Sequence, residues 1–209
     1  MKEVEQLKEK IKKLSQFPHK KRKENYQSYY LRGEYVDGSR NTLYRMDQMS
    51  ISNDLKGLSV LDIGCCLGAI CCECHNRGAS KIMGIDYEKD YIECAKELAK
   101  SNRFDINYVR GDITKTAPMI SGINFNFDEP IDIVFALSLF KHVKGKLFTL
   151  LDGIRWKVCY LETNNVGKEG IKSQHAKEII KYMNDRKWNW KVLTTTDDRS
   201  PRIVFKVVK

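Results

Sequence analysis

The sequence predicts an α/β protein with a doubly wound, mainly parallel seven-stranded sheet that ends in an antiparallel hairpin. Two observations carry this prediction. Short apolar runs of strand length alternate with segments of helical periodicity over short connections, and the last two apolar runs flank a turn-forming segment at residues 197–201. Strands that alternate with helices form parallel sheets, because each helix carries the chain back across one face. At 209 residues, the chain is long enough for one such domain with a substantial core.

The N-terminal region is expected to begin with a helix. Apolar residues recur at helical spacing over residues 2–14, and Pro18 ends the pattern. A dense basic run follows at residues 19–23, which is either a solvated charge cluster or a contact for phosphate or another polyanion.

Residues 25–50 are rich in tyrosine and polar residues and are expected to form a lid or entry segment rather than a core element. Within this segment, Asn41 is a candidate N-cap for a helix that runs through Met49 towards Ile51. We therefore divide the chain into an N-terminal helical and basic entry segment, residues 1–50, and a main domain, residues 51–209.

The main domain supplies the strands and helices of the predicted sheet. The strands are expected to end at Ile63 and to cover residues 81–86, 106–109, 131–137, 156–161, 192–195 and 203–208. The helices are expected over residues 67–76, 91–100, 143–152 and 174–187.

The first strand leads directly into a glycine turn, Val60-Leu61-Asp62-Ile63-Gly64-Cys65-Cys66-Leu67-Gly68. Gly64 and Gly68 allow a tight turn and a close approach of the backbone to a ligand. The first turn of the following helix presents free N–H groups, so such a turn is suited to a nucleotide.

Polar groups also follow the other parallel strands. Asp86 closes the second strand, Asp112 follows the third, and the segment 138–142 follows the fourth. Ligands of open α/β sheets bind beyond the carboxyl ends of the strands. An acid after the second strand can accept hydrogen bonds from both hydroxyls of a ribose, and one after the third can reach an adenine amino group.

Charge and hydropathy limit the partners and the compartment. The formal net charge is +10, which favours an anionic partner such as RNA, an acidic substrate or a membrane surface, unless lysine serves only for solubility. No apolar run approaches a membrane span, and the charged N-terminus does not fit a secretory signal, so we expect a cytoplasmic protein.

Five of the seven cysteines lie within residues 65–74. An odd number gathered around one turn and helix does not fit a disulfide framework. The Cys71–Cys74 pair has C-x-x-C spacing, but a zinc site needs a second ligand pair that the sequence lacks. We expect packing thiols and no metal site.

Together these motifs resemble the class I S-adenosylmethionine-dependent methyltransferases over nearly the whole chain. The segment 62–68 is similar to the first motif of that family, Asp86 to its ribose-binding acid, and Gly111-Asp112-Ile113 to its adenine motif. Cys66 departs from the family, since many members have glycine there. The resemblance implies S-adenosyl-L-methionine as cofactor and the following contact residues: Tyr26, Arg45, Asp62, Gly64, Cys66, Gly68, Asp86, Tyr87, Asp112, Ile113 and Leu137. The resemblance also implies that Tyr26, Gln27 or Arg45 closes over the cofactor carboxylate, to which a guanidinium is well suited.

Two side chains are candidates for general base or substrate orientation, namely His142 and Glu162. The segment Ser138-Leu139-Phe140-Lys141-His142 resembles the Ser-x-x-His-His segment of small-molecule and glycan methyltransferases, with Lys141 in place of the first histidine. Alternatively, His142 caps or packs a helix and Glu162 forms a structural ion pair. The Asn/Asp-Pro-Pro-Tyr/Phe run of amino-methylating DNA enzymes is absent.

The acceptor is predicted least closely. Tyr26-Gln27-Ser28 and Gly38-Ser39-Arg40 are similar to entry segments of glycan and of tRNA wobble-uridine methyltransferases. We expect an O-directed enzyme that acts on a small polar metabolite or a sugar-containing acceptor. The alternatives are an RNA methyltransferase that uses the basic N-terminal segment, and a cofactor-binding protein without catalysis.

Overall fold

The computed structural model describes residues 2–16, 25–114, 129–164, 166–196 and 201–209. The basic run at residues 19–23 and most of the segment 197–201 therefore lie outside the described residues. No helix among the described residues is long and apolar enough to cross a membrane.

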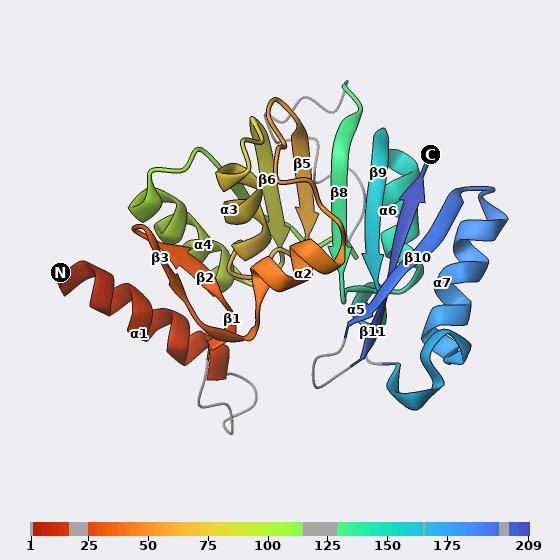
Figure 1. The fold of residues 1–209 in the computed structure, drawn as a ribbon, viewed down its shortest axis with the longest axis horizontal. Helices are drawn as coiled ribbons and strands as arrows, with labels where there is room; N and C mark the ends of the chain where they lie inside the picture. The colour runs from red at the N-terminus through yellow and green to blue at the C-terminus, as the bar shows by residue number, and fades with distance from the viewer. Residues whose placement is uncertain (1, 17–24, 115–128, 165, 197–200) are drawn as a thin grey trace.

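The core of the structure is a seven-stranded sheet with the order β10-β11-β9-β8-β5-β6-β7 (Figure 1). Its strands are β5 (Ser59–Ile63), β6 (Lys81–Asp86), β7 (Asn107–Arg110), β8 (Ile131–Leu137), β9 (Trp156–Glu162), β10 (Asn189–Thr196) and β11 (Arg202–Val208). Strands β5 to β9 pair in parallel, whereas β11 runs antiparallel to both β9 and β10. The predicted fold, including the closing hairpin, is confirmed.

Helices cover both faces of this sheet. Successive residues of each strand point to opposite faces, so Val60 packs on one face and Leu61 on the other. The first face carries α2 (Thr42–Gln48), α3 (Ala69–Asn76) and α4 (Lys89–Asn102), and the second carries α6 (Gly145–Gly153) and α7 (Gln174–Asp185). Two short elements, α5 (Phe140–Val143) and the 3-10 helix η2 (Gly167–Lys172), complete the second layer.

The predicted helices of the main domain differ from the observed ones at their ends, and at two of them the backbone conformation explains the difference. The helix expected from residue 67 begins at Ala69, because Gly68 adopts the left-handed conformation that caps it. The helix expected over 143–152 is divided into α5 and α6, because Lys144 has φ 46° and ψ −133° and interrupts it.

The N-terminal region contains more regular structure than the sequence predicts. Helix α1 (Lys2–Gln16) is followed by four three-residue strands, β1 (Asn25–Gln27), β2 (Tyr29–Leu31), β3 (Glu34–Val36) and β4 (Gly38–Arg40). β2 and β3 form an antiparallel hairpin, and β1 pairs in parallel with β4. The predicted N-cap is confirmed, since Asn41 Oδ1 accepts a hydrogen bond from the backbone N–H of Tyr44 at 2.9 Å.

The expectation that residues 25–50 form no part of the core is wrong. Tyr29 and Leu31 are buried with Leu7 and Ile11 of α1, and they pack against Leu67 of the glycine turn and against α4. Alternation of buried and half-buried residues along β2 produces this packing. The N-terminal region therefore packs against the glycine turn through Leu67.

Candidate functional site

The site lies at the carboxyl edge of the parallel strands. The arrowheads of β5 and β8 point towards α2, which crosses this edge (Figure 1). Strand β11 runs the opposite way, so its first residue, Arg202, starts at the same edge. Residues from the two halves of the chain thus meet where doubly wound sheets bind ligands.

The glycine turn after β5 is fixed by backbone hydrogen bonds. The N–H groups of Gly64 and Cys65 donate to the carbonyl of Ile85 at 2.8 and 3.0 Å. Gly68 has φ +73°, and a Cβ at this position would overlap the hydroxyl of Tyr108. Both the conformation and the space require glycine at the start of α3.

Asp86 is held against this turn. Its Oδ2 accepts the backbone N–H of Cys66 at 2.8 Å, and its Oδ1 accepts that of Glu88 at 3.0 Å. Burial raises the pKa of Asp86, and these two N–H groups partly offset the rise. Because a carboxylate offers about four acceptor positions, the two backbone bonds orient Asp86 and leave capacity for ligand hydroxyls.

Asp62 lies in β5, two residues before Gly64, and is 3% exposed. Burial raises its pKa to about 7, Asp86 adds to the rise, and the positive charge of Arg45 opposes it. Cys71 Sγ donates to its carboxylate at 3.8 Å. A buried carboxyl that titrates near neutrality is well placed to accept a cationic ligand group.

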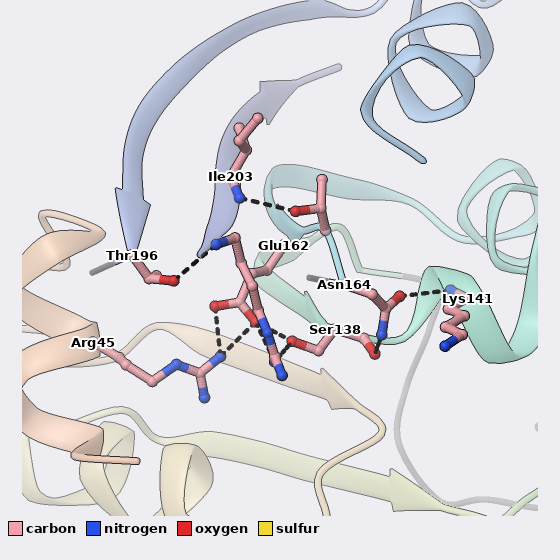
Figure 2. A network of polar contacts seen from close by, with 9 residues as sticks. Arg45, Ser138, Lys141, Glu162, Asn164, Thr196 and Ile203 are labelled. Carbon is pink, nitrogen blue, oxygen red and sulfur yellow. Dashed lines mark hydrogen bonds and ion pairs between the residues drawn. The ribbon is translucent and has the colours of Figure 1, made fainter. Parts of the chain in front are cut away.

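The same edge also carries a buried polar network centred on Glu162 (Figure 2). Nη2 of Arg45 donates to both carboxylate oxygens of Glu162 at 2.9 Å, and Nη1 of Arg202 donates to Oε2 at 3.3 Å. Ser138 Oγ also donates to Oε2 and accepts from Arg202 Nη1. Glu162 is 1% exposed, so the network is screened from solvent.

A second layer of contacts holds this network. Asn164 Nδ2 donates to the carbonyl of Ser138 at 2.7 Å, and Asn164 Oδ1 accepts the N–H of Lys141 at 2.7 Å. Ser138 itself has φ +60°, a strained conformation for a serine. Leu139, the next residue, lies over Gly64, where an added Cβ would be 3.1 Å from its Cδ1. The network and the glycine turn are thereby adjacent.

Residues 54–185 match the family model of a methyltransferase domain. The chain belongs to this methyltransferase family. The predicted class I fold and S-adenosylmethionine as the family's cofactor are confirmed with it.

Curated relatives are similar over part of their length. The ribosomal protein L11 methyltransferase of Dictyoglomus turgidum is 28% identical over 130 residues, which is 59% of this chain and 42% of that protein. The ubiquinone biosynthesis O-methyltransferase of Rickettsia conorii is 31% identical over 95 residues, 46% of this chain and 29% of the relative. The chain thus spans less than half the length of these two relatives.

Solved structures show the same fold. The bifunctional kinase-methyltransferase WbdD superposes with a TM-score of 0.65 at 22% identity, over 90% of this chain and 44% of that one. Magnesium protoporphyrin IX methyltransferase from Synechocystis PCC 6803, solved with bound SAM, superposes with a TM-score of 0.59 at 16% identity. The superposition covers 80% of this chain and 78% of that one.

Within this methyltransferase fold, the other predicted cofactor contacts are distributed along the edge. Asp112 follows β7, and its Oδ1 accepts the N–H and hydroxyl of Thr114 at 2.9 and 2.6 Å. Ile113 packs against the larger core cluster, Leu137 ends β8, and Tyr87 is 62% exposed beside Asp86. Tyr26 of β1 lies under the guanidinium of Arg40, 5.7 Å from its ring centroid. Their contacts with a cofactor remain predictions.

Cys66 takes φ +52°, so the methyltransferase turn holds a side chain where glycine is common. Its backbone N–H still donates a hydrogen bond to Asp86. The neighbouring thiols of Cys65, Cys71 and Cys74 are buried in the second core cluster, and burial raises the pKa of each. They pack α3 against the sheet.

The two candidate bases have different surroundings. Burial alone would raise the pKa of Glu162, but Arg45, Arg202 and the Ser138 hydroxyl lower it. The carboxylate is therefore ionised and fully occupied, which favours the ion-pair alternative over proton abstraction. His142 is exposed on α5, and the bond described for it runs from its backbone N–H to the carbonyl of Leu139 at 2.9 Å. Its catalytic role stays a prediction.

Sequence reasoning missed two functional candidates, Arg40 and Arg202. Arg40 ends β4, and Arg202 begins β11 directly after Pro201. The sequence relates Arg40 to an entry segment as part of Gly38-Ser39-Arg40 but assigns it no contact, and Arg202 lies in no recognisable motif. Only the antiparallel return of the last strand, which pairs Val204 with Glu162, brings Arg202 to this edge.

Proposed function

We propose that this chain transfers a methyl group from S-adenosylmethionine to an oxygen atom of a small polar or sugar-containing acceptor. The observation that carries the proposal is the buried network of Arg45, Ser138, Glu162 and Arg202 beside the glycine turn. Hydrogen-bonding groups that are withdrawn from solvent suit a polar molecule that enters the site better than a broad macromolecular surface.

The residues of the first half would hold the cofactor. The N–H groups at the start of α3 and the carboxylate of Asp86 fit the ribose of the adenosine. The carboxylate of Asp62 fits the ammonium group. When bound, S-adenosylmethionine supplies an electrophilic methyl group on a sulfonium. The protein's main contribution would then be to align the acceptor oxygen with that methyl carbon.

The names of the relatives support methyl transfer but differ in acceptor. The relative from Rickettsia is named for O-methylation in ubiquinone biosynthesis, whereas the relative from Dictyoglomus is named for a ribosomal protein. The choice of a small acceptor therefore rests on the network rather than on the comparisons.

The direct test uses purified protein and S-adenosylmethionine labelled in the methyl group. A cellular metabolite extract, bulk RNA and a protein extract are offered as acceptors in separate reactions. We expect label in the metabolite or glycan fraction, and less of it with the Asp86→Ala variant when S-adenosylmethionine is below saturation. Label in tRNA or rRNA alone would refute the proposal and favour the RNA alternative, whose salt dependence can then be measured.

A further inference from the structure

Three arginines gather around one glutamate at this edge of the sheet. Arg40 comes from β4, Arg45 from α2 and Arg202 from β11, and the first two are each 7% exposed. Glu162 pairs directly with Arg45 and Arg202. Burial lowers the pKa of Arg40, and the positive charges of Arg202 and Arg45 lower it further. The cluster thus repels additional positive charge.

Part of the donor capacity of this cluster is unused within the described structure. Nε of Arg45 and Nε of Arg202 are buried and have no hydrogen-bond partner among the described residues. A buried donor without a partner costs about 1–3 kcal/mol, and a charged one costs more. We therefore expect each of these two Nε–H groups to donate a hydrogen bond to a ligand when the site is filled.

Bound S-adenosylmethionine would add further charges to this site. Its amino-acid end carries an ammonium and a carboxylate, which Asp62 and one arginine can match. Three arginines then face two carboxylates, that of Glu162 and that of the cofactor, and the sulfonium adds another positive charge at the reacting carbon. The acceptor side of the loaded site would consequently carry an excess of positive charge.

We propose that the acceptor is a group that is already anionic at neutral pH, a carboxylate or a phosphate ester, and that Arg202 and Arg40 bind it. This inference rests on the proposed function and specifies its substrate class. A guanidinium matches the planar or forked geometry of both groups.

The reaction for such an acceptor needs no proton transfer. An anionic oxygen forms the new bond to the methyl carbon, while the carbon–sulfur bond breaks and its electron pair stays on sulfur. The products are a methyl ester and the neutral thioether of the cofactor. This agrees with a site in which Glu162 is held ionised by Arg45 and Arg202 rather than poised to accept a proton.

Glu162 and Ser138 are positioning residues in this scheme. Glu162 contacts both Arg45 and Arg202, and Ser138 Oγ bonds to Glu162 and Arg202. They would fix the orientation of the Arg202 guanidinium. Its Nε–H, which has no partner among the described residues, would then donate a hydrogen bond to the methyl acceptor.

The first experiment measures anion binding to the full chain saturated with S-adenosylhomocysteine, so that the cofactor carboxylate already occupies its place. Inorganic phosphate and acetate are titrated by calorimetry at low ionic strength. We expect binding that weakens at least about tenfold in Arg202→Gln, and that Arg202→Lys restores in part. Arg155→Gln is the matched control, because Arg155 is exposed at the amino end of β9. Should Arg202→Gln not fold, Arg40→Gln replaces it.

Absence of phosphate and acetate binding, or equal binding by Arg202→Gln and Arg155→Gln, would overturn the inference. The second experiment examines the labelled product of the metabolite reaction. Volatile methanol released by mild alkali indicates a carboxyl methyl ester, and label released by phosphodiesterase indicates a methyl phosphodiester. Label that resists both treatments refutes the anionic acceptor while leaving O-methylation intact. Absence of any labelled metabolite refutes the proposed function itself.

Discussion

Replacing Glu162 with glutamine should lower the free energy of unfolding by about 3–5 kcal/mol at pH 7, which is the usual cost of removing one partner of a buried ion pair. Glu162 is 1% exposed and accepts from Arg45 at 2.9 Å and Arg202 at 3.3 Å. Glutamine keeps the shape but places an amide donor against these donors. Two buried guanidinium groups would lose their counter-charge.

Urea denaturation followed by tryptophan fluorescence measures this loss. Glu169→Gln serves as the control, because Glu169 is exposed on η2 and its replacement should change stability by less than about 0.5 kcal/mol. The pKa of Glu162 is lowered in the folded protein, below an unfolded value of about 4.3. Its stabilisation is therefore complete above the unfolded pKa and is lost as the pH falls through the folded pKa.

The difference between wild type and Glu162→Gln should thus narrow below about pH 4. A loss smaller than about 1 kcal/mol at pH 7 would show that water replaces the carboxylate, and would refute a closed network. A variant that keeps full stability but loses turnover by about 10²–10⁴-fold would instead identify Glu162 as the general base.

Three further predictions concern the cofactor side. Asp86→Ala should weaken S-adenosylmethionine binding by about 1–3 kcal/mol, since ribose hydroxyls lose a charged acceptor, and unchanged affinity in calorimetry would refute that contact. Gly68→Ala should lower the melting temperature, because φ is +73° and the added methyl meets Tyr108; an unaltered melting curve would contradict this packing. The folded pKa of Asp62, about 7, exceeds its unfolded value, so ligand-free stability should fall as the pH rises from about 4 to 7. Asp62→Asn should remove that slope, which pH-dependent denaturation can check.

The glycine turn and the placement of Asp86 could be predicted because their signals are local in sequence. Gly64 and Gly68 are required by backbone geometry, and Asp86 is an acid placed directly at a strand end. Each of these features depends on one strand and the turn that follows it. The parallel sheet then brings the strand ends together without further information.

The network around Glu162 could not be predicted to the same degree, because it depends on contacts between distant segments. Glu162 was identifiable as a polar group at a strand end, but its ionisation follows from Arg45, 117 residues earlier, and Arg202, 40 residues later. The short strands β1 to β4 have three residues each, too few to show a period. Lys144 interrupts its helix through a backbone conformation that no local pattern indicates.

The packing of α1 leads to a last prediction, on whether the entry segment unfolds with the main domain. Ile11 is fully buried and shares a core cluster with Leu67 of the glycine turn and Leu98 of α4. Ile11→Ala should therefore cost about 2–5 kcal/mol. The three tryptophans of the chain, Trp156, Trp188 and Trp190, lie in or against the larger core cluster with β9, α6 and α7.

Tryptophan fluorescence consequently reports the part of the sheet that is far from α1 in Figure 1. If residues 1–50 and 51–209 unfold as one unit, Ile11→Ala shifts the fluorescence midpoint and the far-ultraviolet circular dichroism midpoint equally. Val192→Ala, an exposed position on β10, controls for nonspecific change. If the entry segment unfolds alone, the circular dichroism signal falls early while the fluorescence midpoint stays at its wild-type value. That result would make residues 1–50 a separable lid. Arg40 and Arg45, the two arginines that this lid supplies to the Glu162 cluster, would then reach the acceptor only when the lid is closed.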